Sequence, residues 1–166
     1  DVPLKECIAA LCSLKARGLT RAIGVSNFPP ALLREAIALA SEPLAVNQVE
    51  YHPYLDQSAL LAALREAGMG LTAYCPLARG QVLTEPVIGD IATRHGVSAA
   101  TVAVAWLIAQ DSVIAIPRSR SPERLAENLK AETLVLSAEE TAAISALAHP
   151  GGRLVSPAFA PDWAAA

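Results

Sequence analysis

The chain has 166 residues and a formal net charge of −3, and hydrophobic residues make up 53% of it. Such a composition excludes a disordered chain, and the acidic balance argues against a general nucleic-acid binder, because phosphate contacts need a basic surface. No apolar run approaches the roughly 20 residues of a membrane span, so we expect no membrane association.

Four short apolar segments alternate with helical ones along the chain. Helices are expected where apolar residues keep helical spacing, and Asp56, Ser98, Ser121 and Ser137 are predicted to cap four of them. The predicted helices are 3–17, 30–40, a segment between Asp56 and Gly68, 86–95, 99–109, 122–130 and 138–147. The predicted strands are 22–25, 44–50, 70–75 and 113–116. The segment from His149 onward is predicted to be irregular and to lie on the surface.

Strict alternation of strands and helices predicts an α/β fold with a parallel sheet, because parallel strands need crossover connections. An open doubly wound sheet and part of a (β/α)₈ barrel both fit this order. No G-x-G-x-x-G follows a strand, which weighs against a nucleotide-binding Rossmann unit. Each strand ends in polar residues, as a barrel active site requires, but the pattern alone leaves both architectures open.

Four strings at these strand ends resemble the aldo-keto reductase family. They are GVSNF at 24–28, NQVEYHPY at 47–54, AYCPL at 73–77, and IPRS at 116–119 followed by PERLAENL at 122–129. The tail, 152–163, is similar to that of bacterial members in the 2,5-diketo-D-gluconate and methylglyoxal reductase group. The resemblance implies a (β/α)₈ TIM barrel, of which this chain matches strands five to eight. Residues 1–150 would then be the C-terminal half of an NADP(H)-binding barrel, and 151–166 an irregular tail.

The resemblance also implies a cytoplasmic enzyme that reduces aldehydes and ketones with NADPH. In the family, strands one to four carry the catalytic Asp, Tyr, Lys and His. His52, His95 and His149 fall outside the context of that histidine, so no catalytic residue is assigned and the isolated chain is expected to be inactive. The first residue is not Met, which leads us to expect an upstream segment. The alternative is a truncated, inactive NADP(H)-binding sensor or regulatory subunit.

By resemblance, the nicotinamide end of the cofactor would be held by residues after the first three strands. Tyr74 would stack on the ring, and Ser26, Asn27 and Gln48 would bond its carboxamide. The alternative is that Tyr74 is a core tyrosine and that residues 26–27 only form a turn. Gln48 would then be a core amide that is hydrogen-bonded within the protein. Cys75 and Leu77 belong to the same string as Tyr74, and Cys75 stands where many relatives have serine. Its alternative is a small buried hydrophobe.

The phosphate end would be held by cations that follow the fourth strand. Arg118, Ser119 and Arg124 would bind the 2′-phosphate of NADPH, with Arg124 in the first turn of the helix that Ser121 opens. Arg120 adds a nearby cation, and the alternative is a solvated basic turn. Asn128 would contact the adenine, and Glu127 is a weaker candidate for the same role. Trp163 would line the substrate pocket.

The expected partners are a small carbonyl substrate and a second piece of protein. Half a barrel exposes two bare strand edges, which invite pairing. The missing N-terminal half-barrel or a second copy of the chain would cover these edges. His52 is interpreted as structural, and the three cysteines, Cys7, Cys12 and Cys75, lack the spacing of a metal site.

Overall fold

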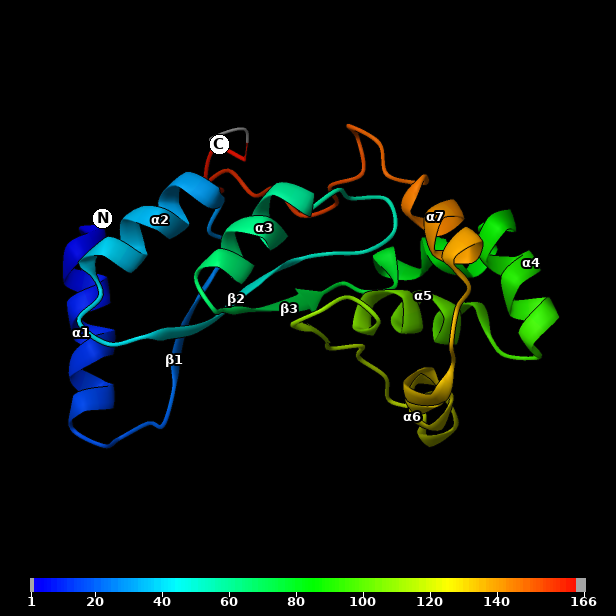
Figure 1. Ribbon diagram of the computed structural model, residues 1–166, viewed down its shortest axis with the longest axis horizontal. Coiled ribbons are helices and arrows are strands. Elements are labelled where there is room, and N and C mark those ends of the chain that lie inside the picture. The colour runs from blue at the N-terminus through cyan, green and yellow to red at the C-terminus, as the bar shows by residue number, and fades with distance from the viewer. Residues whose placement is uncertain (1, 164–166) are drawn as a thin grey trace. The chain divides into compact units, whose positions relative to one another are not determined.

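The computed structural model describes residues 2–163, and the chain divides into two compact units. The first unit lies within 1–49, 58–71 and 157–166, and the second comprises 50–57 and 72–156. The helices are α1 (Leu4–Ala16), α2 (Pro30–Leu39), α3 (Ser58–Glu66), α4 (Pro86–His95), α5 (Ala99–Ile108), α6 (Pro122–Leu129) and α7 (Ala138–Ser145) (Figure 1). The strands are β1 (Ile23–Ser26), β2 (Leu44–Glu50), β3 (Gly70–Tyr74) and β4 (Val113–Ala115), and two short 3₁₀ helices are η1 (Ala78–Thr84) and η2 (Lys130–Thr133).

The strands follow the order β1-β2-β3-β4, which is also their order in the chain. In the first unit β1 runs parallel to β2, with Ser26 opposite Gln48 and a register shift between Ile23 and Gly24. Gly24 is required at this shift, because a Cβ there would lie 2.7 Å from the carbonyl oxygen of Val46. The predicted α/β class with a parallel sheet is confirmed.

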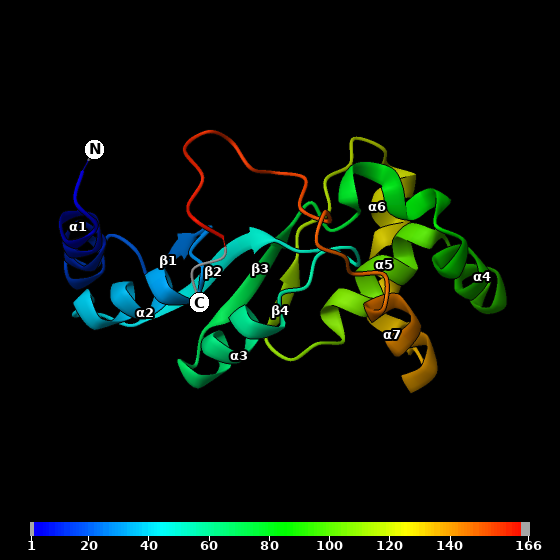
Figure 2. The same cartoon turned by 90° about the horizontal axis from the view of Figure 1, so that it is seen from above.

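Helices cover the strands of each unit. In the first unit α1 packs on α2 and α2 packs on α3. In the second unit α5 is the central helix, with 101–107 all buried and with α4, α6 and α7 around it (Figure 2). No single helix in the described part of the chain is long and apolar enough to cross a membrane. Within residues 2–163, α4 and α5 pass that test as a pair, but they are bent by 94° at the break between them.

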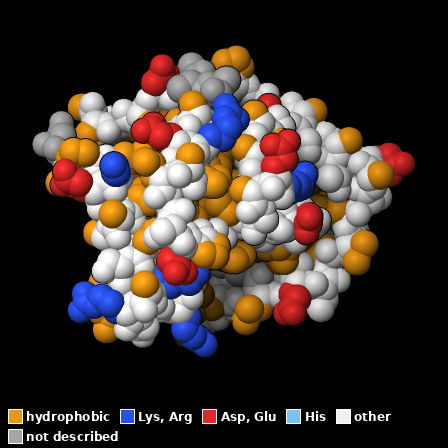
Figure 3. All heavy atoms as spheres, turned by 60° about the vertical axis from the view of Figure 1, so that its left-hand side comes forward, with side chains coloured by type: hydrophobic (Ala, Val, Ile, Leu, Met, Phe, Trp, Pro, Cys, Tyr) orange, Lys and Arg blue, Asp and Glu red, His pale blue; other side chains and the backbone are white. Residues whose placement is uncertain are grey.

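Not all hydrophobic side chains are buried. Figure 3 shows hydrophobic side chains at the surface among acidic and basic ones. Across the described chain the exposed large hydrophobic residues are Val2, Leu14, Leu19, Ile37, Leu83, Ile108, Ile114, Ile116, Leu125, Leu129, Val135 and Phe159.

Most predicted helix boundaries agree with the structure because their caps form. Ser98, Ser121 and Ser137 each accept a hydrogen bond from the amide three residues later, and Ser137 completes a capping box with Glu140. Asp56 stands two residues before Ser58, where α3 begins, and its role as a cap stays a prediction. The two 3₁₀ helices were not predicted. The first of them contains Arg79 and Gly80 at positive φ, which helical periodicity does not reveal.

The prediction that the segment from His149 onward lies on the surface was wrong for its first part. Gly152 is buried, and the amide of His149 donates to the carbonyl oxygen of Tyr54 at 3.2 Å. The amides of Leu154 and Val155 donate to a buried carboxylate on β2. The segment is irregular, but it is bound to the strand ends because that carboxylate needs donors. The predicted division into 1–150 and 151–166 differs from the two compact units and stays a prediction.

Candidate functional site

Three of the predicted cofactor residues lie together in the first unit, at the ends of β1 and β2. The Ser26 hydroxyl donates to the carbonyl oxygen of Gln48 at 2.9 Å, and the amide of Asn27 donates to the same oxygen at 2.9 Å. Asn27 has φ 59°, so the chain turns sharply there, as its residue type favours. The side chains of Ser26 and Gln48 are exposed and open to a ligand.

The buried amide of this region is Asn47, and the alternative interpretation of Gln48 as a core amide was wrong. Asn47 has no exposed surface, and its Nδ2 donates to the carbonyl oxygen of Phe28 at 2.8 Å. Its Oδ1 accepts from the amide of Phe28 at 3.4 Å. Successive residues of a strand point to opposite faces, so burial of Asn47 directs Gln48 outward.

Tyr74 and Cys75 lie in the second unit, where β3 ends. Tyr74 is half-buried, and burial raises the pKa of its hydroxyl, with a further increase from the nearby Glu50 carboxylate. Cys75 is half-buried with φ 52°, so it is not the buried hydrophobe that the alternative interpretation required. A non-glycine residue in this left-handed conformation marks a sharp turn after the strand.

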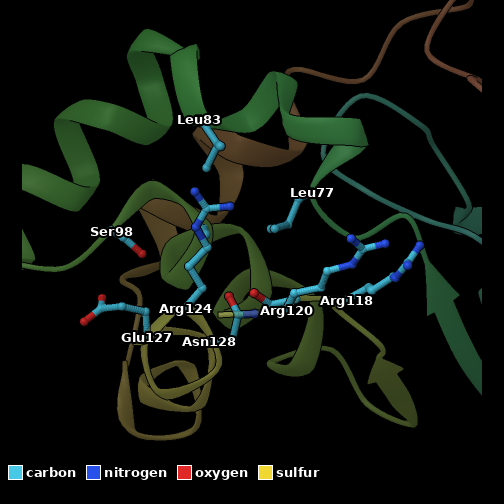
Figure 4. A pocket seen from close by; sticks show the side chains of 10 residues that line it. Leu77, Leu83, Ser98, Arg118, Arg120, Arg124, Glu127 and Asn128 are labelled. Carbon is cyan, nitrogen blue, oxygen red and sulfur yellow. The ribbon is translucent and has the colours of Figure 1, made fainter. Parts of the chain in front are cut away.

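The remaining predicted residues of the second unit line one pocket of about 530 Å³. Its lining residues are Leu77, Leu83, Ser98, Ala100, Arg118, Ser119, Arg120, Arg124, Glu127 and Asn128. In Figure 4 Arg124 stands between Leu83 and Asn128, while Arg118 and Arg120 extend together to one side. Six of these ten residues were predicted, and Tyr74 and Cys75 do not line the pocket.

The pocket includes the first turn of α6. Ser121 caps this helix by accepting from the amide of Arg124 at 3.3 Å, and the Ser119 hydroxyl accepts from the amide of Ser121 at 3.1 Å. These bonds fix the loop that carries Arg118 and Arg120. The start of a helix carries a partial positive charge, and the arginine at the third position of α6 adds to it, so this end of the helix would attract an anion.

The electrostatics of this pocket are strongly positive. None of the ion pairs found within residues 2–163 involves Arg118, Arg120 or Arg124. Glu127, the acidic residue of the lining, pairs with Lys130. Three arginines beside a helix N-terminus fit a phosphate group, whose oxygens accept the paired donors of guanidinium groups.

Sequence reasoning missed four of the lining residues. Leu83 lies in η1, a helix without a recognisable signal, and Ala100 carries no polar group that would draw attention. Ser98 was interpreted only as a cap. Arg120 was noted as a nearby cation, but it was not placed in the site.

Trp163 and His52 do not line this pocket. Trp163 is half-buried and lies in the first unit, and its role at the substrate pocket stays a prediction. His52 has no exposed surface, and its Nε2 lies 2.9 Å from Oε1 of Glu50. This location agrees with the structural interpretation of His52.

Comparison with known proteins decides the family. The profile described as the Aldo/keto reductase family matches residues 1–149. The chain belongs to the aldo/keto reductase family. It is 41% identical over 165 residues to the methylglyoxal reductase DkgB of Escherichia coli O157:H7, an alignment that covers 98% of this chain and 61% of that protein.

Solved structures of the family agree with this assignment. A crystal structure of a candidate 2,5-diketo-D-gluconic acid reductase B superposes with a TM-score of 0.96 at 44% identity, covering 98% of this chain and 58% of the other. A Gox0644 mutant in complex with NADPH superposes with a TM-score of 0.86 at 36% identity, covering 92% and 56%. The aldo/keto reductase chain described here therefore spans less than two thirds of these relatives.

Proposed function

We propose that this chain forms the NADPH-binding part of an aldo-keto reductase that reduces small aldehydes and ketones to alcohols. The observation that carries the proposal is the arginine-lined pocket at the start of α6. Arg118, Ser119 and Arg124 would hold the 2′-phosphate, and Arg120 would add a fourth polar group. Asn128 and Glu127 would face the adenine from the next turn of the helix.

Other residues of the chain would serve the reactive end of the cofactor. Tyr74 offers a half-buried aromatic face for stacking, and Ser26, Asn27 and Gln48 offer polar groups for the carboxamide. When bound, NADPH supplies the hydride that reduces a carbonyl carbon. The named relatives point to methylglyoxal or a diketo sugar acid as the substrate class, and Trp163 is the residue of this chain assigned to it.

We infer further that the chain corresponds to strands five to eight of a (β/α)₈ barrel. It spans 61% of the methylglyoxal reductase that it matches, and β1 and β4 stand at the ends of the strand order. A barrel has no end strands, so these edges would pair with strands one to four. The catalytic Asp, Tyr, Lys and His would come from that half, and the chain alone would bind the cofactor without turnover.

The first test compares NADPH with NADH as ligands of the purified protein by calorimetry. NADPH is expected to bind more tightly, because NADH lacks the phosphate that the arginines would hold. Arg124→Ala should weaken NADPH binding by about tenfold to a hundredfold and leave NADH nearly unchanged, since charged hydrogen bonds contribute about 1.5–3 kcal/mol each.

The matched control is Arg94→Ala, which removes an arginine of the same unit that pairs with Glu140 and does not line the pocket. It should leave both affinities unchanged. Equal affinities for the two cofactors in the unaltered protein would overturn the assignment of the arginine pocket.

A second test concerns turnover. The polypeptide as its native source makes it is expected to oxidise NADPH in the presence of methylglyoxal, whereas the 166-residue chain alone is not. Turnover by the chain alone would show that it carries its own catalytic residues. Cofactor binding without turnover in the native polypeptide would instead favour an NADP(H)-binding regulatory subunit.

A further inference from the structure

A fully buried carboxylate, that of Glu50, has no part in the proposed function. Glu50 is the last residue of β2 and has no exposed surface. Its Oε1 accepts from His52 Nε2 at 2.9 Å and from the amide of Leu154 at 2.7 Å. Its Oε2 accepts from the amide of Val155 at 2.9 Å and lies 3.8 Å from Nη1 of Arg153. One carboxylate thus binds three consecutive residues that lie about a hundred positions away.

These three residues and Gly152 before them form a segment, 152–155, that we call the tail anchor. Its first residue must be glycine, because a Cβ on Gly152 would lie 1.7 Å from the carbonyl oxygen of Tyr54. That same oxygen accepts from the amide of His149, which bonds in turn through its carbonyl to the amide of Gly152 at 2.9 Å. The tail anchor is therefore fixed at one end beside Tyr54, which follows β2, and at the other on Glu50, the last residue of β2.

Tyr74, the last residue of β3, is joined through its backbone to the strand end that carries Glu50. The carbonyl oxygen of Tyr74 accepts from the amide of Tyr51, the neighbour of Glu50, at 3.2 Å. Burial and the Glu50 carboxylate raise the pKa of the Tyr74 hydroxyl, and the Arg153 guanidinium opposes this increase. Glu50 and Arg153 therefore both act on the aromatic residue proposed to stack on the nicotinamide.

Stability alone is a poor explanation for this arrangement. Removing two charges from water offsets most of the attraction between them, and a well-packed apolar pair often stabilises a protein as much. A buried ion pair does, however, fix geometry, because each charge must keep its partners. The arrangement is better explained by the position that it imposes on its neighbours.

We propose that Glu50 and Arg153 are positioning residues, which hold the tail anchor at the end of β2 and thereby fix the ring of Tyr74, at the adjoining end of β3, for stacking on the nicotinamide. The inference rests on the proposed function, because it assumes that NADPH is the ligand. It adds that affinity for the nicotinamide end depends on a carboxylate and a guanidinium that do not touch the cofactor.

The test uses the native full-length polypeptide and two ligands, NADPH and 2′,5′-ADP. The second ligand carries the adenosine and its 2′-phosphate but no nicotinamide. In Glu50→Gln the Kd of NADPH should rise about tenfold, because small misplacements of a positioned group are costly, while the Kd of 2′,5′-ADP stays within about twofold. A general loss of structure would weaken both ligands equally, and that result would overturn the proposal.

The matched control is Glu140→Gln. Glu140 also accepts a backbone amide and pairs with a histidine and an arginine of the second unit, but on α7. It should leave the affinity ratio of the two ligands unchanged. If Glu50→Gln does not fold, Arg153→Met replaces it, and Arg153→Lys should restore most of the NADPH affinity because it keeps the positive charge. Equal affinities in Arg153→Met and the unaltered protein would overturn the proposal.

Hydrogen exchange separates failure of this inference from failure of the proposed function. In Glu50→Gln the amides of Leu154 and Val155 should exchange faster, because they lose the carboxylate that accepts their hydrogen bonds. This readout needs no cofactor. If the unaltered protein binds neither ligand, the proposed function fails and this inference fails with it. Faster exchange with unchanged NADPH affinity would overturn the inference alone.

Discussion

The second unit contains two carboxylates with similar partners and different surroundings. Glu50 and Glu140 each accept backbone amides, bind the Nε2 of a histidine and pair with an arginine. Glu50 is fully buried and binds amides 104 and 105 residues away. The Glu140 side chain is 12% exposed, and the amide that it accepts belongs to Ser137, three residues before it.

The two carboxylates reach a lowered pKa by different routes. Burial alone would raise the pKa of Glu50, but the bonds from His52, Leu154 and Val155 outweigh it and hold the pKa below the ordinary 4.5. The pKa of Glu140 falls to about 2, chiefly because of the Ser137 amide and then His95. Water can replace the partners of Glu140 but not those of Glu50. The same substitution should therefore have a larger effect at Glu50.

The largest expected effect is that of Glu50→Ala. Removing one partner of a buried charge pair leaves the other uncompensated and typically costs about 3–5 kcal/mol. Urea unfolding of the purified protein should show a loss in this range, and the midpoint should fall with it. The sharper form of the test is the double variant Glu50→Ala with Arg153→Met, which removes both charges and should recover part of the loss. Equal losses from Glu50→Ala and Glu140→Ala would contradict the contrast between the two sites.

A smaller loss is expected from Gly152→Ala, which changes the same region without removing a charge. The added Cβ would overlap the carbonyl oxygen of Tyr54, and overpacking of this kind typically costs about 1–3 kcal/mol. The control is Gly89→Ala in α4, where nothing lies within 4 Å of the new Cβ. It should stabilise the protein by about 0.5–1 kcal/mol, because alanine favours helices over glycine. A neutral Gly152→Ala would show that the tail anchor is looser than described.

The same contrast explains what could be predicted from sequence. The site of Glu140 was predictable, because a capping box is a local pattern and Ser137 stands three residues before the glutamate. Helix starts at Ser98 and Ser121, the strand at 44–50 and the arginine cluster before α6 were predictable for the same reason. In each case the interacting groups lie within one turn or one strand of each other.

The site of Glu50 was not predictable from local patterns. Nothing in the residues around Gly152 indicates that their amides meet a carboxylate on β2, so the segment was expected to lie on the surface. The exposure of Gln48 and the burial of Asn47 also depend on which face of β2 is covered. Contacts between distant segments decided each of these points. Leu83 lines the pocket because it lies in η1, and the sequence of that helix has no periodic pattern that would predict it.

A still smaller loss of stability is expected from Ser137→Ala, at the capping box that contains Glu140. The substitution removes the oxygen that accepts from the amide of Glu140, and loss of an N-cap costs about 1 kcal/mol. The Glu140 carboxylate keeps its bond to the amide of residue 137, because that bond is to the backbone. Thermal unfolding should therefore show a modest fall in Tm. A loss as large as that of Glu50→Ala would mean that the Glu140 site contributes as much to stability as the buried Glu50 site.

The finest distinction between the two carboxylates concerns pH and salt. A carboxyl whose pKa is lowered by folding stabilises the protein fully above its ordinary value and progressively less below it. The contribution of Glu140 should therefore be complete above pH 4.5 and should disappear as the pH falls towards 2.

Arg94 and His95, its partners, are 58% and 28% exposed, so salt should screen them. Raising the ionic strength from about 0.1 M to about 1 M shortens the screening length from about 10 Å to about 3 Å. In acid unfolding monitored by circular dichroism, this change should reduce the difference between the unaltered protein and Glu140→Gln by at least half. The corresponding difference for Glu50→Gln should hardly change, because no solvent reaches that carboxylate. If both differences shrink alike, Glu50 exchanges with solvent on the time scale of the measurement, and the tail anchor opens without unfolding of the protein.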